Sequence, residues 1–240
     1  MQARSVPERE EELHALVSVL GRAVGPRFRA LDLGSGTGST AERILSRCPG
    51  ATVVAVDFDP VTRRIGETAL ASWGGRLAWV DADLRRADWV QRLPTGRFDA
   101  AVSTTALHWL DGRALSRLYR DIAHRLRPGG IFLNGDSMAY GPDAQRLRRW
   151  ARQSSKEWYR DRRGPRESWT EWWRAALADP ALATEAALRA DRFPTPSTAR
   201  HGLVRTPDLS GHVRRARAAG FREVEVVWSR WQSRILAAVR

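Results

Sequence analysis

Apolar and polar positions along the chain follow two different periods, and short breaks containing glycine or proline separate the segments. Residues 5–24 show the helical period, because their apolar residues recur three or four positions apart and so share one helix face. These residues are Leu13, Leu16, Val17, Leu20 and Val24. Gly25 and Pro26 follow, and this pair predicts that the helix ends there.

The next part of the chain alternates between two kinds of segment. Short apolar runs predict strands at residues 28–33, 52–57, 77–82, 98–103 and 130–134. Amphipathic segments between them predict helices at residues 39–47, 60–72 and 113–126. Repeated strand–helix units of this length predict a parallel sheet with helices on both of its faces.

The pattern changes after the fifth predicted strand. Residues 137–205 contain no strand-like run and are rich in arginine, alanine and tryptophan, so we expect a helical insertion there. At 240 residues the chain is long enough for one α/β domain with such an insertion. We therefore expect residues 1–240 to form a single domain, with residues 137–205 covering its substrate region.

Regular structure is predicted again near the C-terminus. Pro207 suits the first position of a helix, and we expect one from there to Gly220. Two further runs, residues 222–228 and 233–240, predict a hairpin of strands. Consecutive strands in a hairpin run in opposite directions, so at least one of them must be antiparallel to the sheet.

Composition narrows the possible partners. The formal net charge is +13, which is compatible with a nucleic-acid partner. However, Lys156 is the only lysine, and the arginines are scattered without a dense basic tail. A solvated basic surface is therefore the preferred interpretation, and a nucleic-acid partner and a membrane partner are not expected.

The expected compartment is the cytoplasm. Cys48 is the only cysteine, so no internal disulfide or cysteine-based metal cluster is expected, and the histidines show no metal-binding spacing. The chain has no apolar run of the length that spans a bilayer. Its first residues include acidic side chains where a secretory signal would be basic and then apolar.

The stretch "LDLGSGTGST" carries the first chemical signal, with glycines at positions 34, 36 and 38 behind Asp32. A glycine-rich turn between a strand and a helix brings backbone N–H groups to the carboxyl edge of a sheet. A dinucleotide fingerprint would require glycine at position 39, which is Ser39, and a P-loop would require a lysine. Asp32 would repel a pyrophosphate, so the turn is better suited to a positively charged ligand.

Two more acidic residues follow predicted strands. Asp57 ends the second strand in "VVAVDFDP", where a carboxylate can accept hydrogen bonds from both hydroxyls of a ribose. Asp83 is expected to end the third strand in "WVDADL" and to accept a hydrogen bond from the adenine amino group. Phe58 is expected to lie against the adenine face. Carboxylates at three successive strand ends therefore predict an adenosine-containing ligand.

These pieces resemble the Rossmann-type S-adenosylmethionine-dependent methyltransferases, and among them the small-molecule group that includes trans-aconitate methyltransferase. "FDAAVSTTALHWL" and "RLRPGGIFLNGD" complete the resemblance in the expected order. It implies a seven-stranded, mostly parallel sheet whose last strand is antiparallel. It also implies a cofactor site formed by Asp32, Gly34, Ser35, Gly36, Thr37, Gly38, Asp57, Phe58, Asp83, Leu84, Ser103 and Thr104.

The implied reaction is in-line transfer of a methyl group to an O, N or C atom of a metabolite or natural product. A general base is needed only where the acceptor is protonated, and His108 is the candidate. His108, Trp109, Trp172 and Trp173 are the candidate acceptor contacts. For His108 and the tryptophans, packing of the cofactor pocket or of the insertion remains an alternative.

Other functions remain open at this point. An RNA-directed methyltransferase is less favoured, because the chain has "STTALHW" after the fourth strand and lacks the expected catalytic lysines. A nicotinamide oxidoreductase would leave Asp83 unexplained. A cofactor-binding protein without methyl transfer is the non-enzymatic alternative. We expect a small-molecule methyl acceptor as the partner and a monomer or homodimer as the assembly.

Overall fold

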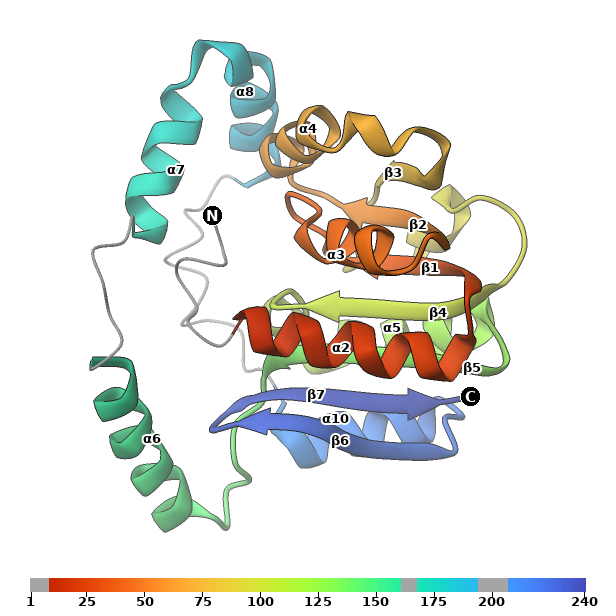
Figure 1. Cartoon of the computed structure of the whole chain (residues 1–240). Helices are drawn as coiled ribbons and strands as arrows, with labels where there is room; N and C mark the ends of the chain where they lie inside the picture. Colours follow the sequence, from red (N-terminus) through yellow and green to blue (C-terminus); the bar gives the residue numbers. More distant parts are fainter. Residues whose placement is uncertain (1–8, 161–167, 194–206) are drawn as a thin grey trace.

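The computed structural model describes residues 9–160, 168–193 and 207–240 (Figure 1). Seven strands form one sheet in the order β3-β2-β1-β4-β5-β7-β6. Their bounds are β1 Arg27–Leu33, β2 Gly50–Asp57, β3 Leu77–Asp81, β4 Phe98–Thr104, β5 Leu126–Ser137, β6 Glu223–Arg230 and β7 Ser233–Val239. The start of the predicted first helix and part of the predicted insertion lie outside the described residues.

The strand directions confirm the predicted sheet. The β1–β5 strands pair in parallel, whereas β7 is antiparallel to both of its neighbours, β5 and β6. The chain order reverses on the two sides of β1, which has β2 on one side and β4 on the other. Ligands of open α/β sheets bind at such a reversal, outside the carboxyl ends of the strands.

Helices cover both faces of the sheet (Figure 1). Those of the α/β units are α2 Arg9–Val24, α3 Ser39–Arg47, α4 Pro60–Ala69, α5 Gly112–Arg125 and α10 Leu209–Ala218. Short 3₁₀ turns lie at Ala71–Arg76, Ala87–Arg92, Leu107–Trp109 and Pro180–Leu182. The expectation that Pro207 opens the last helix is wrong. Asp208 is the N-cap, because its carboxylate accepts from the N–H of Gly211 and fixes the start at Leu209.

The core has two parts, one on each side of the sheet. On one side the apolar faces of α2 and α3 pack on the strands, with Leu16 and Ile44 fully buried. On the other side α5 and α10 pack on the strands, with Tyr119 and Phe132 fully buried in edge-to-face contact. The apolar helix faces and the apolar strands that the sequence predicts therefore pack against each other on both sides of the sheet.

Among the described residues, three α-helices lie between β5 and α10, in the segment predicted as a helical insertion. They are α6 Gln145–Arg160, α7 Trp169–Ala178 and α8 Ala183–Arg192. Figure 1 shows α8 beside α4, at the edge of the sheet that holds β2 and β3, and α7 beside α8. The insertion therefore reaches the main domain next to two of the predicted cofactor-binding strand ends.

Candidate functional site

The glycine-rich turn joins β1 to α3 and is held against β2. The backbone N–H groups of Gly34 and Ser35 both donate to the carbonyl oxygen of Val56, at 2.8 and 3.1 Å. Gly36 and Gly38 complete the turn around Thr37, and both have positive φ angles, of 56° and 81°. The predicted turn therefore forms at the carboxyl end of β1, where the strand order reverses.

Gly34 and Gly36 are constrained in different ways. A Cβ atom on Gly34 would lie 2.4 Å from the Cβ atom of Ala106, far inside van der Waals contact. Gly36 faces open space instead, since no described atom lies within 4 Å of the place its Cβ would take. The turn thus leaves room at Gly36 for a ligand to approach the backbone closely.

Asp57 lies directly against this turn, as predicted. One of its carboxylate oxygens accepts from the N–H of Gly36 at 2.6 Å, and the other accepts from the N–H of Asp59 at 2.8 Å. Burial raises the pKa of Asp57 to about 6, although these hydrogen bonds act in the opposite direction. The carboxylate is therefore held rigidly beside the open position at Gly36.

Asp32 is the most deeply buried of the three predicted acids, with 1% of its surface exposed. One oxygen accepts from the N–H of Ala41 at 3.1 Å, and the other has no hydrogen-bond partner among the described residues. Burial raises the pKa of Asp32 to about 7. A buried acceptor without a donor is costly, so this oxygen is suited to a donor that a ligand would bring.

The third acid is placed differently from the prediction. The β3 strand ends at Asp81, opposite Asp57 in the sheet register, and Asp83 follows two residues later. Asp83 is bound by Arg85, whose Nε and terminal nitrogen donate to its two carboxylate oxygens at 2.8 Å each. Asp83 therefore lies beyond the strand, because the pairing with β2 ends at Ala82, whose N–H donates to the carbonyl oxygen of Asp57 at 3.3 Å. Leu84, beside it, packs against the core.

The end of β4 is tied to its neighbours through hydroxyl groups. Ser103 is fully buried and donates to the carbonyl oxygen of Leu33 at 2.7 Å, which joins β4 to β1. The hydroxyl of Thr104 lies 2.7 Å from that of Thr40. Both predicted residues are thus at the turn. Thr105, which follows, has a φ angle of 51°, a conformation that is uncommon for threonine and occurs often at functional sites.

Arg9 is a site residue that the sequence analysis missed. Its guanidinium donates to the hydroxyls of Ser39, Thr104 and Thr105 at 3.1–3.2 Å, and only 1% of its surface is exposed. No described carboxylate forms an ion pair with it, and burial lowers its pKa. A signal was available, because Arg9 is four residues before Leu13 and so lies on the apolar face of α2.

His108 is held by a second missed residue, Asp136 near the end of β5. The ring Nδ1 of His108 lies 2.8 Å from one carboxylate oxygen, and the backbone N–H of His108 donates to the other at 3.0 Å. The N–H of Ser137 also donates to Asp136, which is 2% exposed. Burial alone would lower the pKa of His108, but the charge and hydrogen bond of Asp136 raise it above its ordinary value.

The predicted aromatic residues fall into two groups. Trp109 lies beside His108, with 5.2 Å between the ring centroids. Trp172 and Trp173 lie on α7 with their centroids 4.9 Å apart, and Trp169 packs on both. The indoles of α7 thus contact one another, and their role toward an acceptor stays a prediction.

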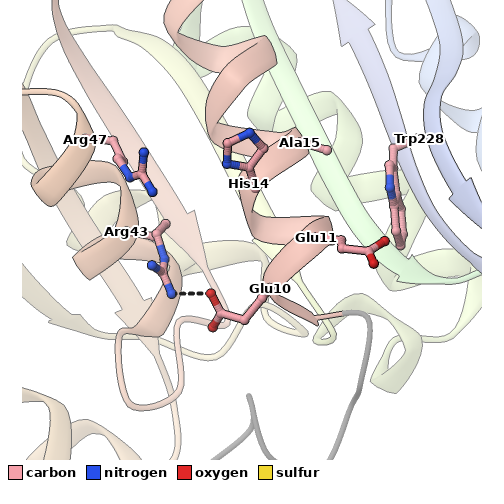
Figure 2. Close-up of a pocket in the computed structure, with 7 residues that line it drawn as sticks. All are labelled: Glu10, Glu11, His14, Ala15, Arg43, Arg47 and Trp228. Carbon is pink, nitrogen blue, oxygen red and sulfur yellow. Dashed lines mark hydrogen bonds and ion pairs between the residues drawn. The ribbon is translucent and has the colours of Figure 1, made fainter. Parts of the chain in front are cut away.

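A separate cavity of 530 Å³ lies on the outer side of α2 and α3 (Figure 2). It is lined by Glu10, Glu11, His14, Ala15, Arg43, Arg47 and Trp228. Glu10 and Arg43 form an ion pair of 2.6 Å across it. All of these residues differ from the predicted cofactor and acceptor residues, so we do not assign the reaction to this cavity.

The described residues contain no cluster of three or more histidine, cysteine or acidic side chains arranged to hold a metal ion. Within the same ranges, every helix is too short or too polar to cross a membrane. The candidate site consists of the glycine turn, the acidic residues near the strand ends and the His108–Asp136 pair.

Comparison with known proteins identifies the family. Residues 30–130, which include the glycine turn, Asp57, Asp83 and His108, match the family model described as a methyltransferase domain. Over these residues the chain is similar to the class I methyltransferases. The strand order with an antiparallel β7 is the fold of this class, and its members use S-adenosylmethionine.

Two relatives of this methyltransferase show how far the similarity extends. An uncharacterized methyltransferase of Mycobacterium tuberculosis is 37% identical over 111 residues, which are 45% of this chain and 47% of the relative. The trans-aconitate 2-methyltransferase of an Azoarcus species is 30% identical over 119 residues, which are 50% of this chain and 43% of the relative. The matched part is thus about half the length of each of these relatives.

A solved structure shows the same fold over nearly all of the chain. An O-methyltransferase family protein from Burkholderia thailandensis superposes with a TM-score of 0.63 and 20% identity, covering 96% of this chain and 55% of that one. The residues of the turn also fit the cofactor of the class. Gly36 offers open space, Asp32 offers a buried acceptor without a donor, and the turn carries no lysine for a pyrophosphate.

Proposed function

We propose that this methyltransferase transfers a methyl group from S-adenosylmethionine to an O, N or C atom of a small molecule. The observation that carries the proposal is the carboxylate of Asp57, which accepts from the N–H of Gly36 beside the open side of the glycine turn. S-adenosylmethionine supplies a methyl group that is already activated on a sulfonium sulfur. The protein has to align the acceptor and exclude water.

Each part of the site has a proposed role toward the cofactor. Asp57 accepts hydrogen bonds from the ribose hydroxyls, at about 1.5–3 kcal/mol for each charge-assisted bond. Asp83 and Phe58 serve the adenine. Asp32 binds the ammonium of the methionine part, which supplies the hydrogen-bond donor that its second oxygen lacks. Arg9 binds the carboxylate of the methionine part, which supplies an anion for its guanidinium. The turn, Leu84, Ser103 and Thr104 shape the pocket around these groups.

His108 is the proposed general base. Because Asp136 lies on its Nδ1, the neutral ring carries its proton there, and Nε2 is the nitrogen that accepts a proton from the acceptor. Asp136 in turn stabilises the protonated ring. Such a pair is useful for a phenol, an enol or an amine, whereas a carboxylate acceptor would need no base.

A small molecule is the proposed acceptor for two reasons. The chain is similar to trans-aconitate 2-methyltransferase over half of its length, and its sequence lacks the motifs of nucleic-acid methylation. Trp109, Trp172 and Trp173 are the proposed acceptor contacts. They offer flat apolar surface next to the proposed base and on the insertion.

The test uses labelled S-adenosylmethionine and a metabolite extract of the host. The wild-type protein is expected to label a small-molecule product that mass spectrometry identifies, and Asp57→Ala is expected to abolish both labelling and cofactor binding. Asp88→Ala removes an exposed carboxylate of the same type and should behave as wild type. Unchanged cofactor affinity in Asp57→Ala, measured by calorimetry, would contradict the proposed site.

A further inference from the structure

Among the described residues, α8 attaches the insertion to the ends of β2 and β3, the predicted cofactor-binding strand ends. Arg192, the last residue of α8, donates to both carboxylate oxygens of Asp81, at 2.8 Å each. It also donates to the carbonyl oxygen of Phe58 at 2.7 Å. One side chain of the insertion therefore contacts the residue that follows Asp57 and the residue that lies opposite Asp57 in the sheet.

Arg189, one turn earlier on α8, makes the second attachment. Its Nε donates to Asp59 at 2.7 Å, and the two side chains are only 14% and 15% exposed. Asp59 caps α4 with its other oxygen, so this ion pair acts on a fixed carboxylate. The guanidinium of Arg189 also lies 4.0 Å from the ring centre of Trp173, which connects α7 to the same place.

Phe193 follows α8 directly and contacts Phe58. Their ring centroids are 5.5 Å apart, at an angle of 63° between the planes. The guanidinium of Arg85 lies 5.5 Å from the centre of the Phe58 ring and 5.9 Å from that of Phe193. The same guanidinium binds both oxygens of Asp83. Two aromatic rings and one carboxylate therefore surround a single planar group.

This planar group marks a place that suits adenine. A guanidinium and an adenine are both flat, both pack on aromatic rings, and both present N–H donors to a carboxylate. Asp83 and Phe58 come from the methyltransferase core, whereas Phe193 comes from the insertion. Phe193, the third residue that lines this place, is thus more than 100 residues away from Asp83 and Phe58 in the sequence.

We infer that α8 is part of the cofactor site, with Phe193 and Phe58 as two aromatic walls of the adenine pocket and Arg189 and Arg192 as the residues that hold Phe193 there. Adenine takes the position of the Arg85 guanidinium and replaces it as the donor to Asp83. Cofactor exchange then requires α8 to separate from Asp59 and Asp81. The inference rests on the proposed use of S-adenosylmethionine and assigns the insertion a role beyond contact with the acceptor.

The test measures binding and dissociation of S-adenosylhomocysteine and of 5′-methylthioadenosine, which has the adenosine end without the amino acid. Phe193→Ala is expected to weaken both ligands about tenfold, as for loss of one aromatic contact with a base. Phe193→Tyr keeps the ring and is expected to retain the affinity. Arg192→Gln is expected to raise the dissociation rate of both ligands by about threefold, and less at high salt, where a partly exposed ion pair is already screened.

Two substitutions next to these residues serve as matched controls. Leu188→Ala shortens an apolar side chain on α8 that is 40% exposed, and Asp191→Asn removes an exposed charge on α8 directly before Arg192. Both are expected to bind as wild type does. Thermal melts establish that every variant is folded.

The outcomes separate this inference from the proposed function. If the wild type binds S-adenosylhomocysteine and Phe193→Ala and Arg192→Gln bind it equally well, α8 is not part of the cofactor site. If Phe193→Ala weakens S-adenosylhomocysteine but leaves methylthioadenosine unchanged, the contact is not with adenine and the inference is wrong. If the wild type binds neither ligand, the proposed function itself fails.

Discussion

We expect the carboxylate of Asp57 to make cofactor affinity depend on pH. Burial raises its pKa to about 6, so at about pH 5 roughly one tenth of the molecules carry it ionised, against nearly all at about pH 8. If the ribose binds the ionised form, this residue alone weakens the cofactor about tenfold over that range, which is about 1.4 kcal/mol. Asp32, with a pKa of about 7, extends the wild-type dependence toward neutral pH.

The assay is calorimetric titration with S-adenosylhomocysteine at several pH values. Asp57→Asn keeps the size of the side chain but does not titrate, so its affinity should vary with pH about tenfold less than that of the wild type. The Asp57→Asn variant should also bind S-adenosylhomocysteine more weakly at every pH above about 6. In the wild type both carboxylate oxygens accept from backbone N–H groups, whereas the variant has an NH₂ group, a donor, in place of one of these oxygens. Asp88→Asn is the matched exposed control.

One result would refute this reasoning. If Asp57→Asn and the wild type lose affinity equally between about pH 8 and pH 5, Asp57 is not the group whose ionisation the ligand requires.

The raised pKa of Asp57 affects the free energy of unfolding in the opposite direction. Because the pKa of Asp57 is raised in the folded protein, its contribution is fully present below about pH 4 and is lost as pH rises through about 6.

Two further predictions concern the base and the turn. His108→Ala is expected to lower kcat by about 10²–10⁴-fold with cofactor affinity unchanged. Asp136→Asn removes the group that raises the pKa of His108, so the rise of kcat with pH should move to lower pH in a pH–rate profile. An unmoved profile would speak against the pair. Gly34→Ala should destabilise the fold by about 1–3 kcal/mol in thermal melts because of its clash with Ala106, whereas Gly36→Ala should chiefly weaken cofactor binding.

The sheet and the glycine turn could be predicted because their signals are local. The run ending at Asp57 and the turn around Gly36 are each contained in about ten consecutive residues, and parallel strands bring both to one edge. The third strand was more difficult. Asp81 and Asp83 are two positions apart with similar neighbours, and only the pairing with β2 decides which one ends the strand.

The missed residues act over long separations in the sequence. Arg9 reaches Thr104 from 95 residues away, and a helix period shows that its position is buried but not what it contacts. Asp136 follows an apolar strand and looks like an ordinary strand end, yet its partner His108 is 28 residues earlier. The arginines of α8 lie in a segment rich in arginine, so composition does not distinguish the two that contact Asp59 and Asp81 from the rest.

The location of the His108–Asp136 pair has a consequence for how this protein could diversify. His108 lies in the 3₁₀ turn that follows β4, and Asp136 lies near the end of β5, so neither comes from the helices that interrupt the chain after β5. Replacing α6 and α7 by other helices would therefore exchange the surface offered to acceptors while leaving the proton-accepting pair in position. The boundary for such grafting lies before α8, because its ion pairs with Asp59 and Asp81 attach it to the core and would have to be retained.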